Sequence, residues 1–151
     1  MGCALVSDRP ARCGMASVTE DRIQIARELL EEARSEYQKA QQEKGGTAVI
    51  ALRNSCGKGW LAALEAANAF FIKQGAAEDE LPHSDRGRRY FARHYMEPEL
   101  RRTFVDLRQT FHVDGYYEGI VEFEDMPDYF AELEEFINLV EVEPPREVLP
   151  E

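Results

Sequence analysis

The chain has 151 residues, of which 44% are hydrophobic and 31% are charged, and its formal net charge is −11. This length fits one domain with a folded core, and the acidic balance argues against a protein whose whole surface binds phosphate. No apolar run approaches the ~18 residues of a membrane span, and three cysteines are too few for a disulfide framework. We therefore expect an acidic, cytoplasmic protein without a membrane partner.

The first part of the chain predicts a tail followed by a long helix. Residues 1–16 show neither a signal peptide nor an amphipathic period, so we expect a disordered tail or an over-long start. Ser17 and Glu20 have the spacing of a capping box. Apolar residues then recur at spacings of three and four up to Ala40, which predicts an amphipathic helix ending near Lys44.

The second predicted helix is the most informative element. We expect Gly45 and Gly46 to end the first helix and Thr47 to cap the second, which runs to about Gly75. Its stripe consists mostly of small side chains, Leu52, Cys56, Gly59, Ala63, Ala66 and Phe70, and Gly57 also lies inside the helix. Glycine inside a helix costs roughly 1 kcal/mol relative to alanine, which a sequence tolerates where another backbone comes close. This helix is therefore predicted to lie at the centre of a bundle, with its glycines in structural roles.

Three further helices are predicted in the second half of the chain. A polar loop over residues 76–87 leads into an arginine-rich helix over about 85–95. A fourth helix begins at Pro98 and stops at Asp114–Gly115, a loop follows, and a fifth begins after Asp125. Residues 143–151 contain three prolines and are expected to be extended. The predicted fold is all-α, a four- to five-helix up-and-down bundle over residues 17–142.

The charge of the chain is unevenly distributed. Residues 85–112 contain seven arginines and four acidic residues, whereas residues 118–151 contain twelve acidic residues and one arginine. One interpretation is that these faces are solvated or pair with each other, within the fold or across a dimer. The other is an arginine-lined groove, including Arg88 and Arg101, for the phosphate of a nucleotide or RNA, because the planar guanidinium matches phosphate oxygens.

Few residues carry recognisable chemistry. The three histidines are scattered and no Cys-x-x-Cys motif occurs, so we expect neither a metal site nor a cofactor. Cys56 fits a packed core position, and residues 57–59 lack the strand and the Ser/Thr of a phosphate-binding loop. One possibility remains, in which histidine moves the 2′-hydroxyl proton of RNA and arginine stabilises the charged phosphate. The candidate pairs are Arg108 with His112 and Arg89 with His94.

Two segments of the chain resemble a known family. They are the run from His112 to Gly119, which contains Tyr116 and Tyr117, and the glycine-bearing run from Cys56 to Leu61. Over residues 20–142 the chain is similar to a small bacterial family of HEPN-like helical bundles, a domain of unknown function. The resemblance implies a homodimer and a role as an RNA-cleaving toxin or as the partner of a nucleotidyltransferase. It also implies that active members carry an Arg–polar–His signature with four to six intervening residues.

The candidate pairs depart from that signature. Only three residues separate Arg108 from His112, and Arg89 and His94 point about 140° apart on an ideal helix. We therefore expect a binding or accessory role, beside a nucleotidyltransferase or in a toxin–antitoxin pair. The alternatives are a metal-independent ribonuclease and a structural adaptor whose acidic fifth helix docks a basic partner.

The turn at the end of the fourth helix has two interpretations. In both of them Gly115 and Gly119 shape the backbone. In the first, Tyr116 or Tyr117 closes the end of the bundle and donates its hydroxyl to a backbone carbonyl. In the second, a tyrosine stacks on a base of the nucleotide or RNA.

Overall fold

The computed structural model describes residues 15–146 and confirms an all-α fold, since this range contains no strand. Its helices are α2 (Met15–Gln42), α3 (Gly45–Lys73), α4 (Asp85–Tyr95), α5 (Pro98–Leu107), the π-helix η2 (Arg108–Glu118) and α6 (Met126–Val142), with the short turns η1 (Glu78–Glu80) and η3 (Phe123–Asp125). Most of the predicted tails, residues 1–14 and 147–151, lie outside the described residues. Within residues 15–146, no helix combines the length and the apolar character that crossing a membrane requires.

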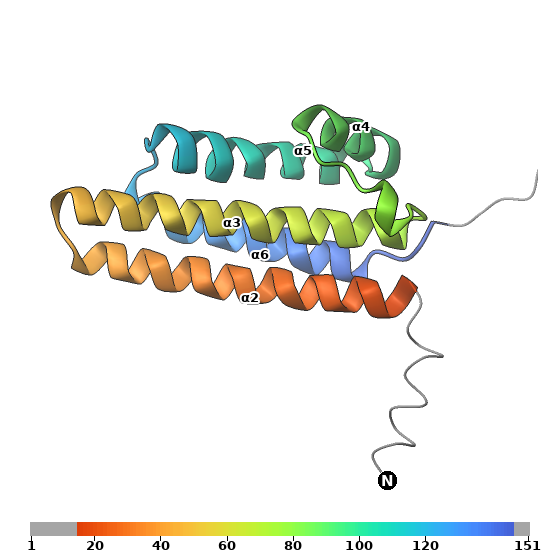
Figure 1. The fold of residues 1–151 in the computed structure, drawn as a ribbon, viewed down its shortest axis with the longest axis horizontal. Helices are drawn as coiled ribbons and strands as arrows, with labels where there is room; N and C mark the ends of the chain where they lie inside the picture. The colour runs from red at the N-terminus through yellow and green to blue at the C-terminus, as the bar shows by residue number, and fades with distance from the viewer. Residues whose placement is uncertain (1–14, 147–151) are drawn as a thin grey trace, which may run out of the picture.

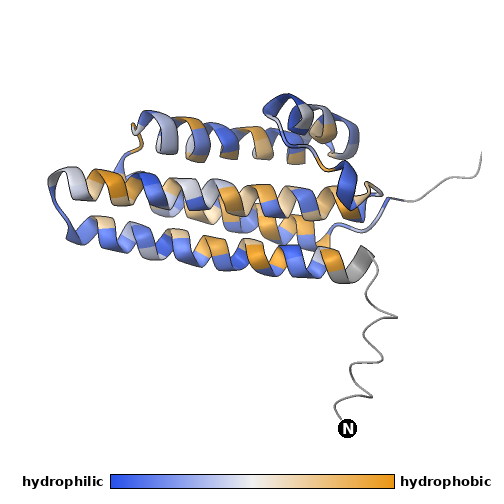
Figure 2. Cartoon of the chain, in the orientation of Figure 1, coloured by the Kyte–Doolittle hydropathy of each residue, from blue (hydrophilic) through white to orange (hydrophobic). Residues whose placement is uncertain are grey.

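The long helices form a bundle around α3 (Figure 1). Helices α2 and α3 lie side by side, α6 packs against both, and α5, continued by η2, covers another side of α3. Helix α3 is largely apolar, whereas hydrophilic and hydrophobic residues alternate along α2 (Figure 2). Helix α3 has buried residues on several of its sides, including Leu52, Trp60 and Phe71. It is therefore the central helix of the bundle, as predicted.

The small residues of α3 allow η2 to approach closely. A Cβ added to Gly59 would lie 2.6 Å from Cδ1 of Phe111, which is fully buried. On the opposite element, a Cβ added to Gly115 would lie 2.4 Å from Sγ of Cys56. Both distances are far shorter than van der Waals contact, so the two backbones can pack at this separation only because neither glycine has a side chain.

Two predicted helix starts are wrong. Helix α2 begins at Met15, so Ser17 lies inside it rather than before it. Helix α3 begins at Gly45 after Lys44, so Thr47 lies in its first turn. Gly45 has a left-handed φ of +61°, and the chain can therefore reverse within a shorter connection than the sequence indicates. The starts of α4 and α6 agree with prediction, and the hydroxyl of Ser84 accepts the Gly87 N–H at the first of them.

The predicted stop of the fourth helix at Asp114–Gly115 is also wrong. Helix α5 widens into η2, which continues to Glu118 and ends at Gly119 with φ +67°. Arg53 of α3 donates its Nε–H to the carbonyl oxygen of Tyr116 at 2.9 Å, and its guanidinium also donates to the carbonyl of Tyr117. A helix end leaves such carbonyls without partners. Arg53 satisfies two of them, which stabilises the longer helix.

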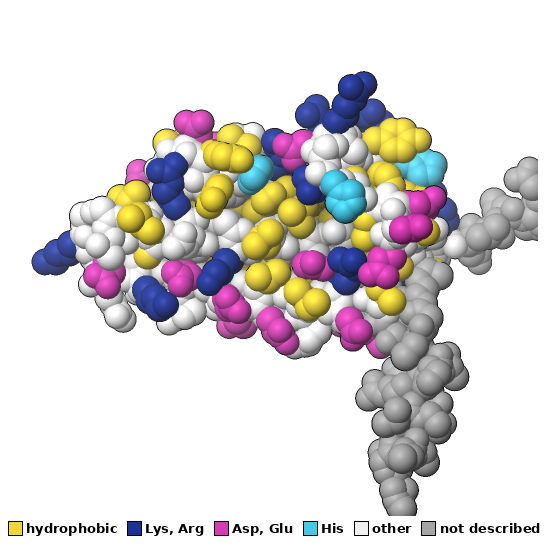
Figure 3. Space-filling view, in the orientation of Figure 1, with side chains coloured by type: hydrophobic (Ala, Val, Ile, Leu, Met, Phe, Trp, Pro, Cys, Tyr) yellow, Lys and Arg dark blue, Asp and Glu magenta, His cyan; other side chains and the backbone are white. Residues whose placement is uncertain are grey.

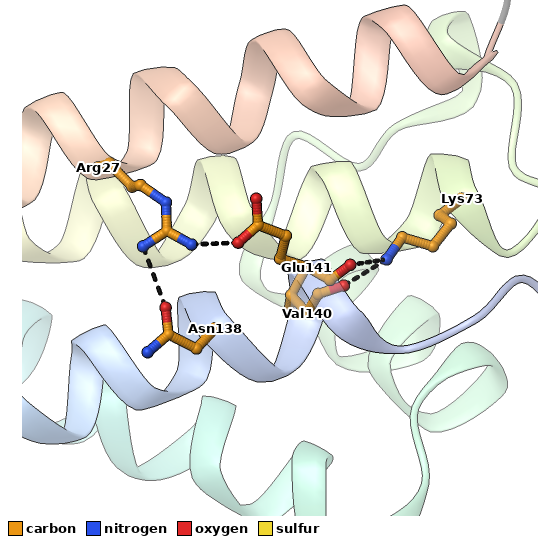
Figure 4. Close-up of polar contacts among 5 residues, drawn as sticks. All are labelled: Arg27, Lys73, Asn138, Val140 and Glu141. Atoms are coloured by element: carbon orange, nitrogen blue, oxygen red, sulfur yellow. Dashed lines mark hydrogen bonds and ion pairs between the residues drawn. The ribbon is translucent and has the colours of Figure 1, made fainter.

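Polar contacts from both neighbouring helices fix the C-terminal half of α6 (Figure 4). Arg27 of α2 donates to Oδ1 of Asn138 at 3.0 Å and forms an ion pair with Glu141. Lys73, at the end of α3, donates to the carbonyl oxygens of Val140 and Glu141. These carbonyls lie in the last turn of α6, where a cation is favourable for the helix dipole. The acidic α6 is therefore held by cations from α2 and α3.

Candidate functional site

A groove with a volume of about 660 Å³ lies between α4 and α5, with Trp60 of α3 in its wall. Its basic side chains are Arg88, Arg89, Arg93, Arg101, Arg102 and Arg108. Asp85 is the one acidic residue among the described residues that line it. We call this hollow the arginine groove. It brings together Arg88, Arg89, Arg101 and Arg108, four of the residues that the sequence singles out.

Asp85 holds two of these arginines in place. Its Oδ2 accepts a hydrogen bond from Nη2 of Arg108 at 2.8 Å, and its Oδ1 lies 3.3 Å from Nη1 of Arg88. The hydrogen bond from Arg108, together with the charges of both arginines, lowers the pKa of the Asp85 carboxyl. Asp85 therefore stays ionised and neutralises part of the charge of the groove.

The other four arginines of the groove have no such partner. The guanidinium groups of Arg89, Arg93, Arg101 and Arg102 form no hydrogen bond or ion pair with any residue that the structure describes. Their positive charges are thus available to a ligand. Arginine is well suited to this task because its planar fork of N–H donors can bind a phosphate or carboxylate through two bonds at once.

The acidic residues of α6 do not neutralise the groove. Glu134 pairs with Arg34 at 2.8 Å and Glu141 pairs with Arg27, both on α2. Helix α5 separates the arginine groove from a second groove of about 470 Å³, which is lined by Glu97, Glu99, Asp106, Glu135 and Glu143 together with Arg102. Within residues 15–146, the four unpaired arginines of the groove therefore do not pair with the acidic face, contrary to the interpretation that the two faces neutralise each other inside the fold.

His112 lies next to this cluster of charges. Its ring stacks on Trp60 with the centroids 5.4 Å apart, and Tyr117 meets its ring edge to face at 4.9 Å. Burial lowers the pKa of His112, the nearby Arg108 and Arg88 lower it further, and Asp85 partly opposes them. The imidazole is therefore neutral at pH 7. The sequence predicts two Arg–His pairs. In the pair of Arg108 with His112, both residues lie in the same group of interacting charges.

The side chains of Arg89 and His94 lie in different environments. Arg89 lines the arginine groove, whereas His94 does not. The exposed ring of His94 lies parallel to Tyr90, with centroids 6.2 Å apart, and edge-on to Tyr95 at 4.6 Å. This separation agrees with the angle of about 140° expected for a five-residue offset on a helix.

A second hollow, of about 360 Å³, adjoins this region on the side of Tyr116. Its lining residues are Asn54, Gly57, Lys58, Trp60, Leu61, His112 and Tyr116, and we call it the tyrosine hollow. The ring of Tyr116 lies over Gly57, where an added Cβ would be 3.1 Å from its Cδ1. Trp60 belongs to the walls of both hollows.

The turn tyrosines do not close the bundle through their hydroxyls. Neither Tyr116 nor Tyr117 has a hydroxyl hydrogen bond among residues 15–146. The tyrosine that does donate to a backbone carbonyl is Tyr37, which reaches Phe123 at 2.7 Å. Tyr116 and Tyr117 are 44% and 61% exposed as residues, so both remain accessible to a ligand.

Several residues of these hollows were not among the predicted site residues, and Asp85, Trp60 and Asn54 are three of them. Asp85 precedes Arg88 by three positions on one helix, a spacing that indicates an ion pair. Trp60 and Asn54 give no comparable signal, because they join the site only through the packing of α3 against α5 and η2.

The described residues contain no group of three or more His, Cys, Asp or Glu side chains arranged to hold a metal ion. Comparison of the chain with protein-family models, curated proteins and solved structures finds no significant match. The geometry of the arginine groove is therefore the main guide to function.

Proposed function

We propose that the protein binds RNA or a nucleotide through phosphate groups in the arginine groove, and that its role is binding or accessory. The observation that carries this proposal is a set of four arginines in one groove that have no carboxylate partner among the described residues. Like charges held together repel one another, and a bound phosphate removes that repulsion. The volume of about 660 Å³ lies within the range of ligand sites.

The single tryptophan of the chain, Trp60, provides a direct test because it lies in the wall of the groove. Titration with a single-stranded oligoribonucleotide at low salt should change its fluorescence. Arg101→Glu should weaken binding at least tenfold, because it places a carboxylate among the remaining arginines. Arg86→Glu is the matched control, since Arg86 is exposed on α4 and does not line the groove. Equal losses of affinity in Arg101→Glu and Arg86→Glu would show that the oligoribonucleotide does not bind specifically in the arginine groove.

The HEPN-like resemblance adds a proposal about partners. It supports a homodimer that acts beside a nucleotidyltransferase or as one component of a toxin–antitoxin pair. Light scattering of the purified protein in high salt measures the oligomeric state directly. A dimer that persists in high salt is expected, and a monomer at micromolar concentration would count against the resemblance.

A metal-independent ribonuclease is a second candidate, favoured by the neutral His112 beside Arg108. A neutral imidazole can accept the 2′-hydroxyl proton of RNA while arginine stabilises the charge of the phosphate. Incubation of RNA with the wild type, His112→Ala and His94→Ala tests this. Loss of cleavage in His112→Ala alone supports the candidate, whereas equal cleavage by all three, or none by the wild type, excludes it.

The adaptor role is favoured by the second groove, whose acidic side chains come from α5, α6 and the capping residues Glu97 and Glu143. Burial and the charges of Asp106, Asp128 and Glu135 raise the pKa of Glu132 beside that groove. Such a concentration of acid would attract a basic partner. Binding of a lysine- and arginine-rich peptide that is lost at high salt, and is unaffected by the histidine substitutions, would support this role.

A further inference from the structure

The tyrosine hollow differs chemically from the arginine groove that it adjoins. Of the described residues that line it, only Lys58 is charged. Its Nζ lies 3.1 Å from Oε1 of Glu32 and 3.9 Å from Oε2 of Glu36, so that charge is already paired. The remaining walls are rings, the exposed side chain of Leu61, the backbone at Gly57 and the amide of Asn54. The hollow is therefore suited to a flat, uncharged group rather than to a phosphate.

A row of aromatic rings leads from the core of the bundle to this hollow. Phe104 stacks on Trp60 with centroids 5.6 Å apart, and Trp60 stacks on His112 at 5.4 Å. Tyr117 follows His112 at 4.9 Å, and Tyr116 follows Tyr117 at 5.4 Å. Phe104 and Trp60 are buried, whereas the two tyrosines are exposed, so the surface end of the row is open to another ring.

The exposed end of the row belongs to an apolar surface. Hydrophobic side chains gather over α3 and η2 in the middle of the face shown in Figure 3. The amide of Asn54 makes no hydrogen bond within the described chain, so it can both donate and accept at the edge of the hollow. Stacking surfaces with a free amide at their edge match the requirements of a nucleobase.

Trp60 joins the two hollows, because it lines both. A nucleotide has one chemical group for each cavity: an anionic phosphate that suits the arginine groove and a flat base that suits the tyrosine hollow, joined through a sugar. We propose that the tyrosine hollow holds one nucleobase of a single-stranded nucleic acid whose phosphates lie in the arginine groove. This inference rests on the proposed function and adds that the ligand must present an unstacked base. The bases of a duplex are stacked inside the helix and cannot enter.

Fluorescence anisotropy with three labelled probes tests the inference. The probes are a single-stranded oligoribonucleotide, an abasic strand of the same length and charge, and a blunt-ended duplex. The wild type should bind the single strand roughly five- to 150-fold more tightly than the abasic strand, which corresponds to the energy of one stacked base. The duplex should bind no better than the abasic strand.

Substitutions then assign the preference to the hollow. Tyr116→Ala should remove the preference for the single strand over the abasic strand, and Tyr116→Phe should retain it. Tyr116→Leu keeps an apolar group over Gly57 without a ring, so it should also lose the preference while the fold is preserved. Tyr90→Ala is the matched control, because Tyr90 is 63% exposed on α4 and lies outside both hollows.

The possible results separate this inference from the proposed function. Equal binding of the single strand and the abasic strand by the wild type would overturn the base site and leave the arginine groove in place. Failure to bind any of the three probes would overturn both proposals. A preference that survives Tyr116→Ala and Tyr116→Leu would show that the base binds elsewhere.

Discussion

Asp85 limits the positive charge of the arginine groove, and it therefore limits the affinity of the groove for anions. Replacement by asparagine keeps the shape of the side chain but removes its charge, which leaves Arg88 and Arg108 without a carboxylate partner. Asp85→Asn should tighten the binding of a single-stranded oligoribonucleotide several-fold at fixed salt. Its effect on stability should be below about 1 kcal/mol, because both ion pairs are partly exposed.

Asp106→Asn is the matched control for this substitution. Asp106 lies on α5 but lines the second groove, the one of about 470 Å³ with acidic walls, and its replacement changes the net charge by the same amount. Anisotropy titrations of the two variants at the same ionic strength provide the comparison. An equal gain in affinity from both would mean that net charge, and not the local charge of the groove, controls binding.

His112 should make stability depend on pH. Its pKa in the folded protein is below the ordinary value of 6.5, so the unfolded chain takes up a proton first as the pH falls. The free energy of unfolding should therefore decrease as the pH falls from about 7.5 to 5.5, in a range above the titration of most carboxyl groups. Urea unfolding should show a smaller decrease for His112→Gln than for the wild type, and His94→Gln serves as the histidine control. A decrease that is identical in all three proteins would contradict the prediction.

At the scale of elements, the contact between α3 and η2 depends on the absence of a side chain at residue 59. Gly59→Ala would place its Cβ 2.6 Å from the ring of Phe111, which is buried between α3 and the stacked ring of Phe130. Overpacking of this kind costs about 1–3 kcal/mol, and the gain in helix propensity of about 1 kcal/mol offsets only part of it. Urea denaturation should therefore show a lower free energy of unfolding.

Gly46→Ala is the control for the close contact at Gly59. Gly46 also lies in α3, but a Cβ at this position would meet no atom within 4 Å. This variant should be as stable as the wild type or slightly more stable. A similar loss from both substitutions would show that the cost reflects the helix backbone rather than the packing of Phe111.

The periodicity of the chain predicts which segments are helical, but it does not predict how the helices end. Spacings of three and four define the buried stripes of α2 and α5 because each is a single amphipathic surface. The end of η2 depends instead on Arg53, which is distant in sequence and donates to the carbonyl of Tyr116. Gly115 resembles a stop signal, yet it lies inside η2, where residue 115 is a glycine because Cys56 occupies the space that a side chain would need.

At the scale of the whole molecule, the sequence shows the separation of charge but not its geometry. The arginine-rich stretch indicates a basic face, and Arg88 and Arg101 do line the arginine groove. Whether acidic residues neutralise that face depends on which helices are neighbours. The ion pairs of α6 with α2 follow from the bundle topology, and so does the contribution of Trp60 from α3 to both hollows. A linear pattern cannot supply these contacts.

The unpaired charge of the molecule should appear in the salt dependence of binding. Each phosphate of a single strand that is neutralised contributes about −0.7 to the slope of log K against log salt concentration. Four unpaired arginines in the groove therefore predict a slope of about −3 for an oligoribonucleotide. Arg101→Ala should reduce its magnitude by about 0.7. Arg34→Ala should leave the slope unchanged, because Arg34 is already paired with Glu31 and Glu134 on the α2–α6 side of the bundle. A slope that both substitutions reduce equally would mean that the strand follows the net charge of the protein, and the arginine groove would then have no separate role.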